Sequence, residues 1–151
     1  MKATVPMTAL LVSLALAGCI QQPTPKVMPG PVMSVAEAKR YALDQRKNEV
    51  LRELATCESG GHGEAEQPIV GGRGAYIGRF QFMPRTVISY VQQMDGRTLS
   101  LTEAKDLAHD YDQAKELAKY MIFEQGRVND WPLCARKIGL RAQVEEIKSQ
   151  E

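Results

Sequence analysis

The sequence is poor in aromatic residues, has no excess of charge of either sign and contains no long hydrophobic run. Aromatic side chains make up 6% of the 151 residues, and 19 basic residues stand against 18 acidic ones. This balance, together with the lack of a basic stripe, argues against a nucleic-acid partner. An apolar content of 44% and a charged content of 25% exclude a polytopic membrane protein, a collagen-like fibre and a fully disordered chain. The length predicts one domain.

Cysteine is also scarce, and its odd count of three means that at least one is free, modified or paired between chains. The first, Cys19, closes a segment typical of a secretory signal, in which Lys2 precedes an apolar run over residues 7–17. A run of about eleven residues is too short to span a bilayer, which needs roughly 20. The end of the segment, Leu16-Ala17-Gly18-Cys19, resembles the bacterial lipobox. We therefore expect residues 1–18 to be a lipoprotein signal peptide and Cys19 to be lipidated; the alternative is a buried first helix.

Proline is concentrated after this signal. Residues 19–33 contain four of the eight prolines of the chain, at positions 23, 25, 29 and 31. Such a segment cannot build a core, and it predicts an extended tether between a lipid anchor and a working domain. We place that domain at residues 34–139 and expect residues 140–151 to be a polar C-terminal tail.

Local start signals predict helices through most of the domain. Ser34 with Glu37 and Ser100 with Glu103 form capping boxes, and Asp110 followed by Gln113 marks a third start. Prolines at 84 and 132 suit first helical turns. The expected helices cover about 35–57, 84–94, 100–109, 110–125 and 132–138.

A glycine-rich stretch interrupts this helical pattern between residues 62 and 82. Two short pieces with strand character, 68–70 and 75–82, flank the turn sequence Gly71-Gly72-Arg73-Gly74, which predicts a hairpin. The expected fold class is therefore mainly α (α+β), a small helical domain with a minor β-hairpin.

Glu58 is the strongest candidate for chemistry. It lies at the end of an expected helix in the run Cys57-Glu58-Ser59-Gly60-Gly61. There the negative end of the helix dipole disfavours an ionised carboxylate, and apolar neighbours would desolvate it. Both effects raise the pKa of a carboxyl group, and glycosidic cleavage needs an acid that stays protonated near neutral pH. The alternative is a solvated glutamate in a last helical turn.

Three further motifs follow Glu58 in order. They are Gly78-Arg79-Phe80-Gln81-Phe82, Pro84-Arg85-Thr86 and Trp131-Pro132-Leu133-Cys134. Together with the Glu58 run, they resemble the resuscitation-promoting factor domain and, more broadly, the lytic transglycosylases of the lysozyme-like superfamily. The resemblance covers the chain from Leu54 to Gly139.

This resemblance implies a lysozyme-like fold and a role for each matching residue. Glu58 would be the catalytic acid, Gln81 would bind sugar, and Cys57 would form a disulfide with Cys134. An exported chain meets an oxidising compartment, which favours such a bond, although two buried reduced cysteines are the alternative. The Gln81 amide can donate and accept hydrogen bonds to an N-acetyl or hydroxyl group, but it also suits a polar position on a strand.

Three other side chains are candidate substrate contacts. Tyr76 and Trp131 carry flat rings that suit sugar faces, and Thr86 belongs to the second motif. A core position is the alternative for Trp131, and a simple helix-start position is the alternative for Thr86.

A second carboxylate and a metal site have weaker support. Glu64, Glu66 and Asp95 could supply the carboxylate, but a solvated loop position explains each of them better. His62 and His109 are far apart in sequence and have no ligand spacing, so we expect no metal.

The resemblance also implies a reaction, cleavage of the β-1,4 bond between N-acetylmuramic acid and N-acetylglucosamine. With one carboxyl group, a lytic transglycosylase protonates the glycosidic oxygen and then closes a 1,6-anhydro ring through the sugar's own 6-hydroxyl, without a cofactor. Hydrolysis by the usual routes needs a second carboxylate. A lysozyme-type hydrolase, a non-catalytic wall-binding module and a structural envelope lipoprotein are the alternatives.

The lipobox gives this expected enzyme a place in the cell envelope. A lipid on Cys19 would hold it beside peptidoglycan, at the periplasmic face of the outer membrane in a diderm. In a monoderm the same anchor would hold it at the outer face of the cytoplasmic membrane.

Overall fold

The computed structural model describes residues 33–62 and 69–151. The expected signal peptide, lipidated Cys19 and most of the tether lie outside the described residues, as do Glu64 and Glu66. Among the described helices, none is long and apolar enough to cross a membrane.

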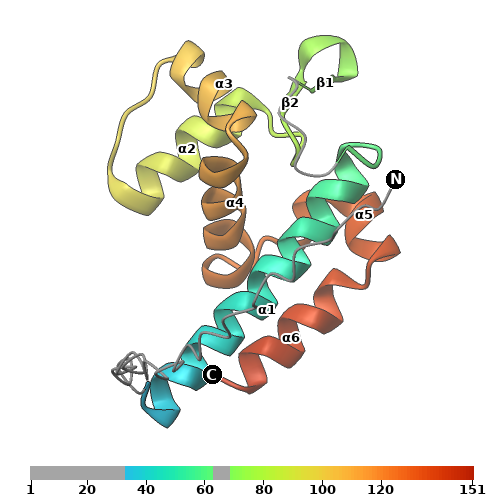
Figure 1. Ribbon diagram of the computed structural model, residues 1–151. Helices are drawn as coiled ribbons and strands as arrows, with labels where there is room; N and C mark the ends of the chain where they lie inside the picture. The colour runs from blue at the N-terminus through green and yellow to red at the C-terminus, as the bar shows by residue number, and fades with distance from the viewer. Residues whose placement is uncertain (1–32, 63–68) are drawn as a thin grey trace, which may run out of the picture. The chain divides into compact units, whose positions relative to one another are not determined.

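The domain is a small, mainly helical unit with a two-stranded antiparallel hairpin, which confirms the expected class at this level (Figure 1). Short 3-10 segments (η1, Gly72–Gly74; η3, Val128–Asp130) and one π-helical turn (η2, Tyr120–Glu124) connect the main elements. The main elements are α1 (Val35–Glu58), β1 (Val70–Gly71), β2 (Tyr76–Ile77), α2 (Pro84–Asp95), α3 (Leu101–His109), α4 (Tyr111–Lys119), α5 (Pro132–Lys137) and α6 (Leu140–Ser149).

The helix starts lie where the capping signals predict them. Ser34 and Ser100 each accept a hydrogen bond from the backbone of the glutamate three residues on, and that glutamate bonds back to the serine N–H. The Asp110 side chain accepts from the Gln113 N–H, 3.0 Å away. These contacts satisfy N–H groups that a helix start otherwise leaves without partners.

The core forms where α1 meets the later helices. The apolar face near the end of α1, which consists of Val50, Leu51, Leu54 and Ala55, is buried. Helix α4 packs against α1 and also contacts α2 and α3. The Phe80 ring lies in this core, stacked on Phe82 and Tyr111 with ring centroids 5.8 and 6.1 Å apart. Burial of these apolar surfaces is the main force that holds the helices together.

The hairpin is shorter than the sequence predicts. Val70 pairs with Ile77 and Gly71 with Tyr76, so each strand has only two residues. Beyond Ile77 the chain turns sharply, and Ile77 and Phe82 exchange both backbone hydrogen bonds at 2.9 Å. This turn requires glycine at position 78, because its φ is +74° and a Cβ there would lie 1.7 Å from the Ala108 carbonyl oxygen of α3.

The expected polar tail over residues 140–151 is wrong for most of its length. Helix α6 occupies this segment and lies beside α1 (Figure 1). Its Leu140, Val144 and Ile147 are buried and form one stripe at helical spacing. The polar residues between them obscured this stripe in the sequence.

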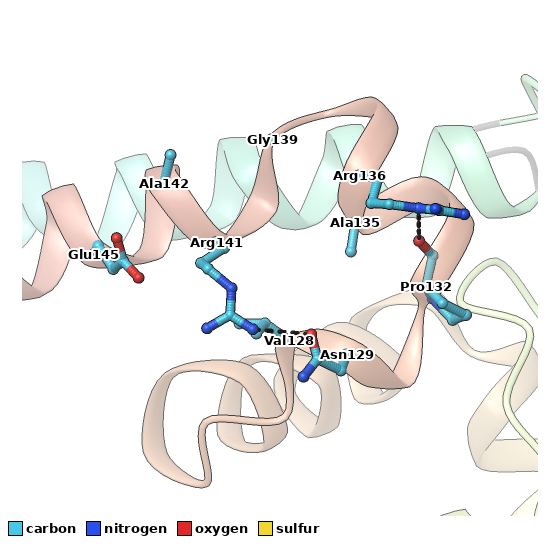
Figure 2. Close-up of a pocket in the computed structure, with 9 residues that line it drawn as sticks. All are labelled: Val128, Asn129, Pro132, Ala135, Arg136, Gly139, Arg141, Ala142 and Glu145. Carbon is cyan, nitrogen blue, oxygen red and sulfur yellow. Dashed lines mark hydrogen bonds between the residues drawn. The ribbon is translucent and has the colours of Figure 1, made fainter.

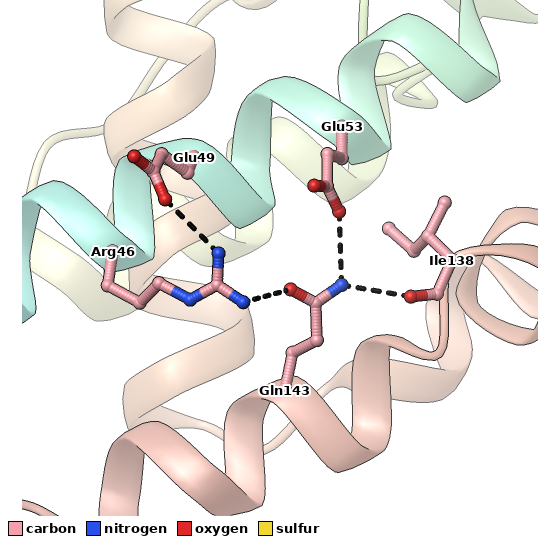
Figure 3. Close-up of polar contacts among 5 residues, drawn as sticks. All are labelled: Arg46, Glu49, Glu53, Ile138 and Gln143. Carbon is pink, nitrogen blue, oxygen red and sulfur yellow. Dashed lines mark hydrogen bonds and ion pairs between the residues drawn. The ribbon is translucent and has the colours of Figure 1, made fainter.

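A polar cluster also joins α6 to α1 (Figure 3). The Gln143 amide donates to a Glu53 carboxylate oxygen at 3.0 Å and to the Ile138 carbonyl at 2.9 Å. Its oxygen accepts from Arg46 at 3.1 Å, and Arg46 is also paired with Glu49. The amide nitrogen and oxygen of this one side chain are therefore both hydrogen-bonded, to Glu53 and Arg46 of α1 and to the Ile138 carbonyl after α5.

The packing of α6 predicts unequal effects for two leucine substitutions. Leu140 is fully buried, whereas Leu133 is 72% exposed. We expect Leu140→Ala to lower the free energy of unfolding by about 2–5 kcal/mol, because it leaves a cavity, and Leu133→Ala to lower it by less than about 0.5 kcal/mol. Urea denaturation measures both values, and equal effects would contradict the packing described for α6.

Candidate active site

Glu58 is the last residue of α1, and the chain turns away directly after it. Gly60 and Gly61 both have positive φ, at 67° and 94°. The Gly61 N–H bonds to the Thr56 carbonyl at 2.8 Å and the Gly60 N–H to the Cys57 carbonyl at 3.4 Å, which is the hydrogen-bond pattern of a Schellman C-cap. This turn ends the helix at Glu58 and leaves its side chain at the surface of a groove.

The Glu58 carboxyl is half-buried, and this burial raises its pKa above the ordinary value of 4.5. Desolvation is the cause, because a low-dielectric surrounding penalises the charged form. Among the described residues no cation forms an ion pair with Glu58 to offset that penalty. The direction agrees with the expectation from the sequence.

The groove at Glu58 consists of two adjoining hollows of about 400 and 270 Å³. Both hollows are lined by the same four residues, Tyr76, Gln81, Asp130 and Trp131. The first also includes Glu58 and the second Thr86. All five residues that the sequence singled out as catalytic or substrate-binding therefore line this groove.

Gln81 is held in an unusual conformation at the junction of the two hollows. Its φ is +50°, a value that few residues other than glycine adopt. Its Nε2 donates to the Gly78 carbonyl at 2.8 Å, and its Oε1 lies against the backbone of Gly71. Strained backbone of this kind occurs often at functional sites. One amide N–H of Gln81 is used in this bond, and the other forms no hydrogen bond among the described residues.

Trp131 has a structural role as well as a place in the groove. It is 4% exposed, its ring meets Phe82 edge-on, and its Nε1 donates to the Phe80 carbonyl at 2.8 Å. The indole N–H therefore has no capacity left for a sugar, and only part of the ring lines the hollows. Tyr76, in contrast, is 43% exposed and presents its ring at the surface.

Thr86 lies in the first turn of α2, where its N–H bonds to the Met83 carbonyl at 2.9 Å. Its half-buried side chain lines the second hollow. Both interpretations of this residue, as a helix-start position and as a groove residue, are therefore compatible with its place.

The predicted disulfide between Cys57 and Cys134 is present. The sulfur atoms are 1.99 Å apart and the Cα atoms 5.8 Å apart, within the usual range. The bond joins the last turn of α1 to α5, next to Glu58 on one side and close to Trp131 on the other. The residues on both sides of the groove are thus covalently connected.

Asp130 lines the groove but was not among the residues predicted from the sequence. It lines both hollows, whereas Asp95 lies outside both of them, in an ion pair with Arg97 at the end of α2. The one signal in the sequence was its position directly before the Trp131 motif. Leu133, a second missed residue, adds an exposed apolar side chain to the first hollow.

A larger hollow of about 710 Å³ lies elsewhere, between η3, α5 and α6 (Figure 2). Two of its three charged residues, Arg136 and Arg141, are hydrogen-bonded to the Pro132 carbonyl and to Asn129, respectively; the third is Glu145. It contains none of the sequence-predicted site residues except the motif residue Pro132. Volume alone therefore does not single out the groove at Glu58. Within the described ranges, no group of three or more His, Cys, Asp or Glu side chains is placed to hold a metal ion.

The contact of Gly71 with Gln81 predicts a substitution that displaces the Gln81 side chain with little effect on stability. A Cβ on Gly71, whose φ is −108°, would lie 1.9 Å from the movable Oε1 of Gln81. We expect Gly71→Ala to displace the Gln81 side chain while changing the stability by about 1 kcal/mol or less. Gly78→Ala would meet backbone at positive φ instead and should destabilise the fold by more than about 2 kcal/mol. Side-chain amide NMR signals and thermal unfolding test both, and an unmoved Gln81 signal in Gly71→Ala would disprove the contact.

The raised pKa of Glu58 predicts a pH-dependent gain in stability for Glu58→Gln. The folded protein binds the Glu58 proton more tightly than the unfolded chain does, so ionisation lowers the stability as the pH rises from about 4.5 through the higher folded pKa. Glutamine does not titrate. The advantage of the variant over the wild type should therefore grow across this window and level off above it. Urea denaturation at a series of pH values measures the difference, and a difference independent of pH would contradict the raised pKa.

Comparisons of the chain with models of known protein families, with curated proteins and with solved structures give no match. The function of the groove has to be inferred from the chemistry of its own residues.

Proposed function

We propose that this protein is a lytic transglycosylase of lysozyme-like fold that cleaves the β-1,4 bond between N-acetylmuramic acid and N-acetylglucosamine in peptidoglycan. The observation that carries the proposal is the half-buried Glu58 carboxyl, with its raised pKa, in the wall of a groove. A glycosidic oxygen needs a proton from such an acid when its bond breaks. The resemblance of the sequence motifs supports the same assignment.

In the proposed reaction, Glu58 alone carries out both proton transfers. Its proton goes to the glycosidic oxygen, the bond from that oxygen to C1 of N-acetylmuramic acid breaks, and the N-acetylglucosamine side leaves with a hydroxyl group. The Glu58 carboxylate then takes the proton of the 6-hydroxyl, whose oxygen bonds to C1 and closes the 1,6-anhydro ring. Glu58 ends protonated and ready for the next cycle.

The other groove residues would hold the glycan across Glu58. The exposed Tyr76 ring offers a flat apolar face for a sugar. The second N–H of the Gln81 amide, which has no partner in the described part of the chain, can donate to a carbonyl or hydroxyl oxygen. Thr86 adds a hydroxyl group in the second hollow. Lipidation of Cys19 would keep this groove in the cell envelope, beside its substrate.

Hydrolysis of the same bond is a second candidate, which one observation favours. Asp130 brings a second carboxylate to the groove, as the usual two-acid mechanisms require. Water would then replace the 6-hydroxyl, and the product would carry an ordinary reducing end. The two products differ in mass by one water molecule.

Mass spectrometry of the fragments released from purified peptidoglycan tests the proposal. We expect the purified protein to release 1,6-anhydro fragments and Glu58→Gln to lower the rate by at least about a hundredfold, because the general acid is lost. Glu49→Gln, which removes an exposed carboxylate from the same helix, should leave the rate unchanged.

Three other results would each point elsewhere. Fragments with reducing ends would indicate a hydrolase. No fragments, with retention on isolated cell walls, would indicate a wall-binding module. Neither fragments nor retention, with stable co-purification of a protein partner, would indicate a structural envelope lipoprotein.

A further inference from the structure

Asp130 lies where the two hollows of the groove adjoin, but the proposed reaction does not use it. It ends η3 and lines both hollows, together with Tyr76, Gln81 and Trp131. The next residue, Trp131, is fixed by its bond to the Phe80 carbonyl. The backbone that carries Asp130 is therefore anchored to the core.

The Asp130 side chain is fixed as well, by Arg127. The Arg127 Nε donates to one carboxylate oxygen at 3.1 Å, and its terminal nitrogen contacts the other at 2.9 Å. Arg127 is held in turn by its backbone N–H, which bonds to the Met121 carbonyl at 2.8 Å. Such a two-point pair sets the orientation of the carboxylate plane.

This arrangement leaves Asp130 able to accept further hydrogen bonds. A carboxylate has about four lone-pair positions, and the two contacts with Arg127 use one on each oxygen. The side chain is 25% exposed and faces a groove that would hold a glycan. Glycans present many hydroxyl and acetamido N–H donors, and a carboxylate can only accept from them.

We propose that Asp130 is a substrate-binding carboxylate, which accepts hydrogen bonds from hydroxyl or N–H groups of the glycan and fixes its position relative to Glu58. This inference rests on the proposed function. It assigns Asp130 to binding, while proton transfer stays with Glu58. Substitution of Asp130 should therefore change the affinity for the glycan and KM more than kcat.

The chain offers a matched control for this proposal. Asp95 is paired with Arg97, with a contact of 2.8 Å, but it lies outside both hollows. Asp130→Asn and Asp95→Asn each remove one charge from an arginine-paired aspartate. Arg127→Gln and Arg97→Gln remove the arginine from each pair, and in the groove this leaves the carboxylate in place but no longer oriented.

The experiment measures the binding of a soluble N-acetylglucosamine oligomer to full-length protein that carries Glu58→Gln, so that no cleavage occurs. We expect Asp130→Asn to weaken binding about tenfold, the loss of a charge-assisted hydrogen bond, and Arg127→Gln to weaken it by less. Asp95→Asn and Arg97→Gln should bind like the parent protein. In the otherwise wild-type chain, Asp130→Asn should raise KM for peptidoglycan about tenfold with kcat changed less than about threefold and with 1,6-anhydro products retained.

Each contrary outcome has a defined meaning. Equal affinity of the Asp130 and Asp95 variants, or no binding of the oligomer by the parent protein, would overturn the role of Asp130. A loss of kcat with unchanged KM would assign Asp130 to catalysis instead. If Asp130→Asn unfolds, as thermal unfolding would show, Arg127→Gln decides, and parental affinity in that variant overturns the inference. If the wild-type protein binds the oligomer but releases no fragments, the proposed function fails while the binding role of Asp130 stands.

Discussion

The disulfide between Cys57 and Cys134 is the constraint on which the geometry of the groove depends. It joins the residue before Glu58 to α5, whose preceding residues, Asp130 and Trp131, line the same hollows. Because it spans 77 positions, the chain-entropy model gives it about 4 kcal/mol of stabilisation, an upper figure. Its local effect matters as much, since a groove formed at the ends of two helices would otherwise widen whenever either end frayed. A covalent bond one residue from the acid limits that motion.

The position of Glu58 at the end of α1, next to this disulfide, lowers the stability of the fold. Burial of this carboxyl, which has no cationic partner within residues 33–62 and 69–151, opposes its ionisation, and the C-terminal end of α1 adds an unfavourable dipole. The protein tolerates this cost because the preceding turns of α1 bury Leu51, Leu54 and Ala55 completely. The long α1 is further secured by α6, through the apolar stripe and the contacts of Gln143 (Figure 3). Stability gained along the helix thus offsets the unfavourable group at its end.

The sequence was informative wherever the signal was local. Ser34, Ser100 and Asp110 cap helices with contacts three residues away, and the glycines after Glu58 end α1 by their own backbone freedom. Two features that depend on contacts between distant segments were missed. They are helix α6, whose apolar stripe has meaning only against α1, and the entry of Asp130 into the groove. The π-helical turn after α4 was also missed, although its contacts are local. It makes an i+5 bond from Gln125 to Tyr120, and its Met121 carbonyl accepts from the backbone N–H of Arg127, the partner of Asp130.

The two carboxyl groups that line the described groove differ in their ionic partners, and this difference suggests a separate role for each. Asp130 is paired with Arg127 through both oxygens, whereas Glu58 forms no ion pair among the described residues and its pKa is raised by burial. In sites with two carboxyl groups, one group can donate a proton while the other acts as a charge or an acceptor. A paired Asp130 therefore fits an acceptor for glycan donors, and Glu58 fits the acid. The 6-hydroxyl of the sugar can complete a reaction with one such acid, and the presence of a second carboxylate in a groove does not by itself require hydrolysis.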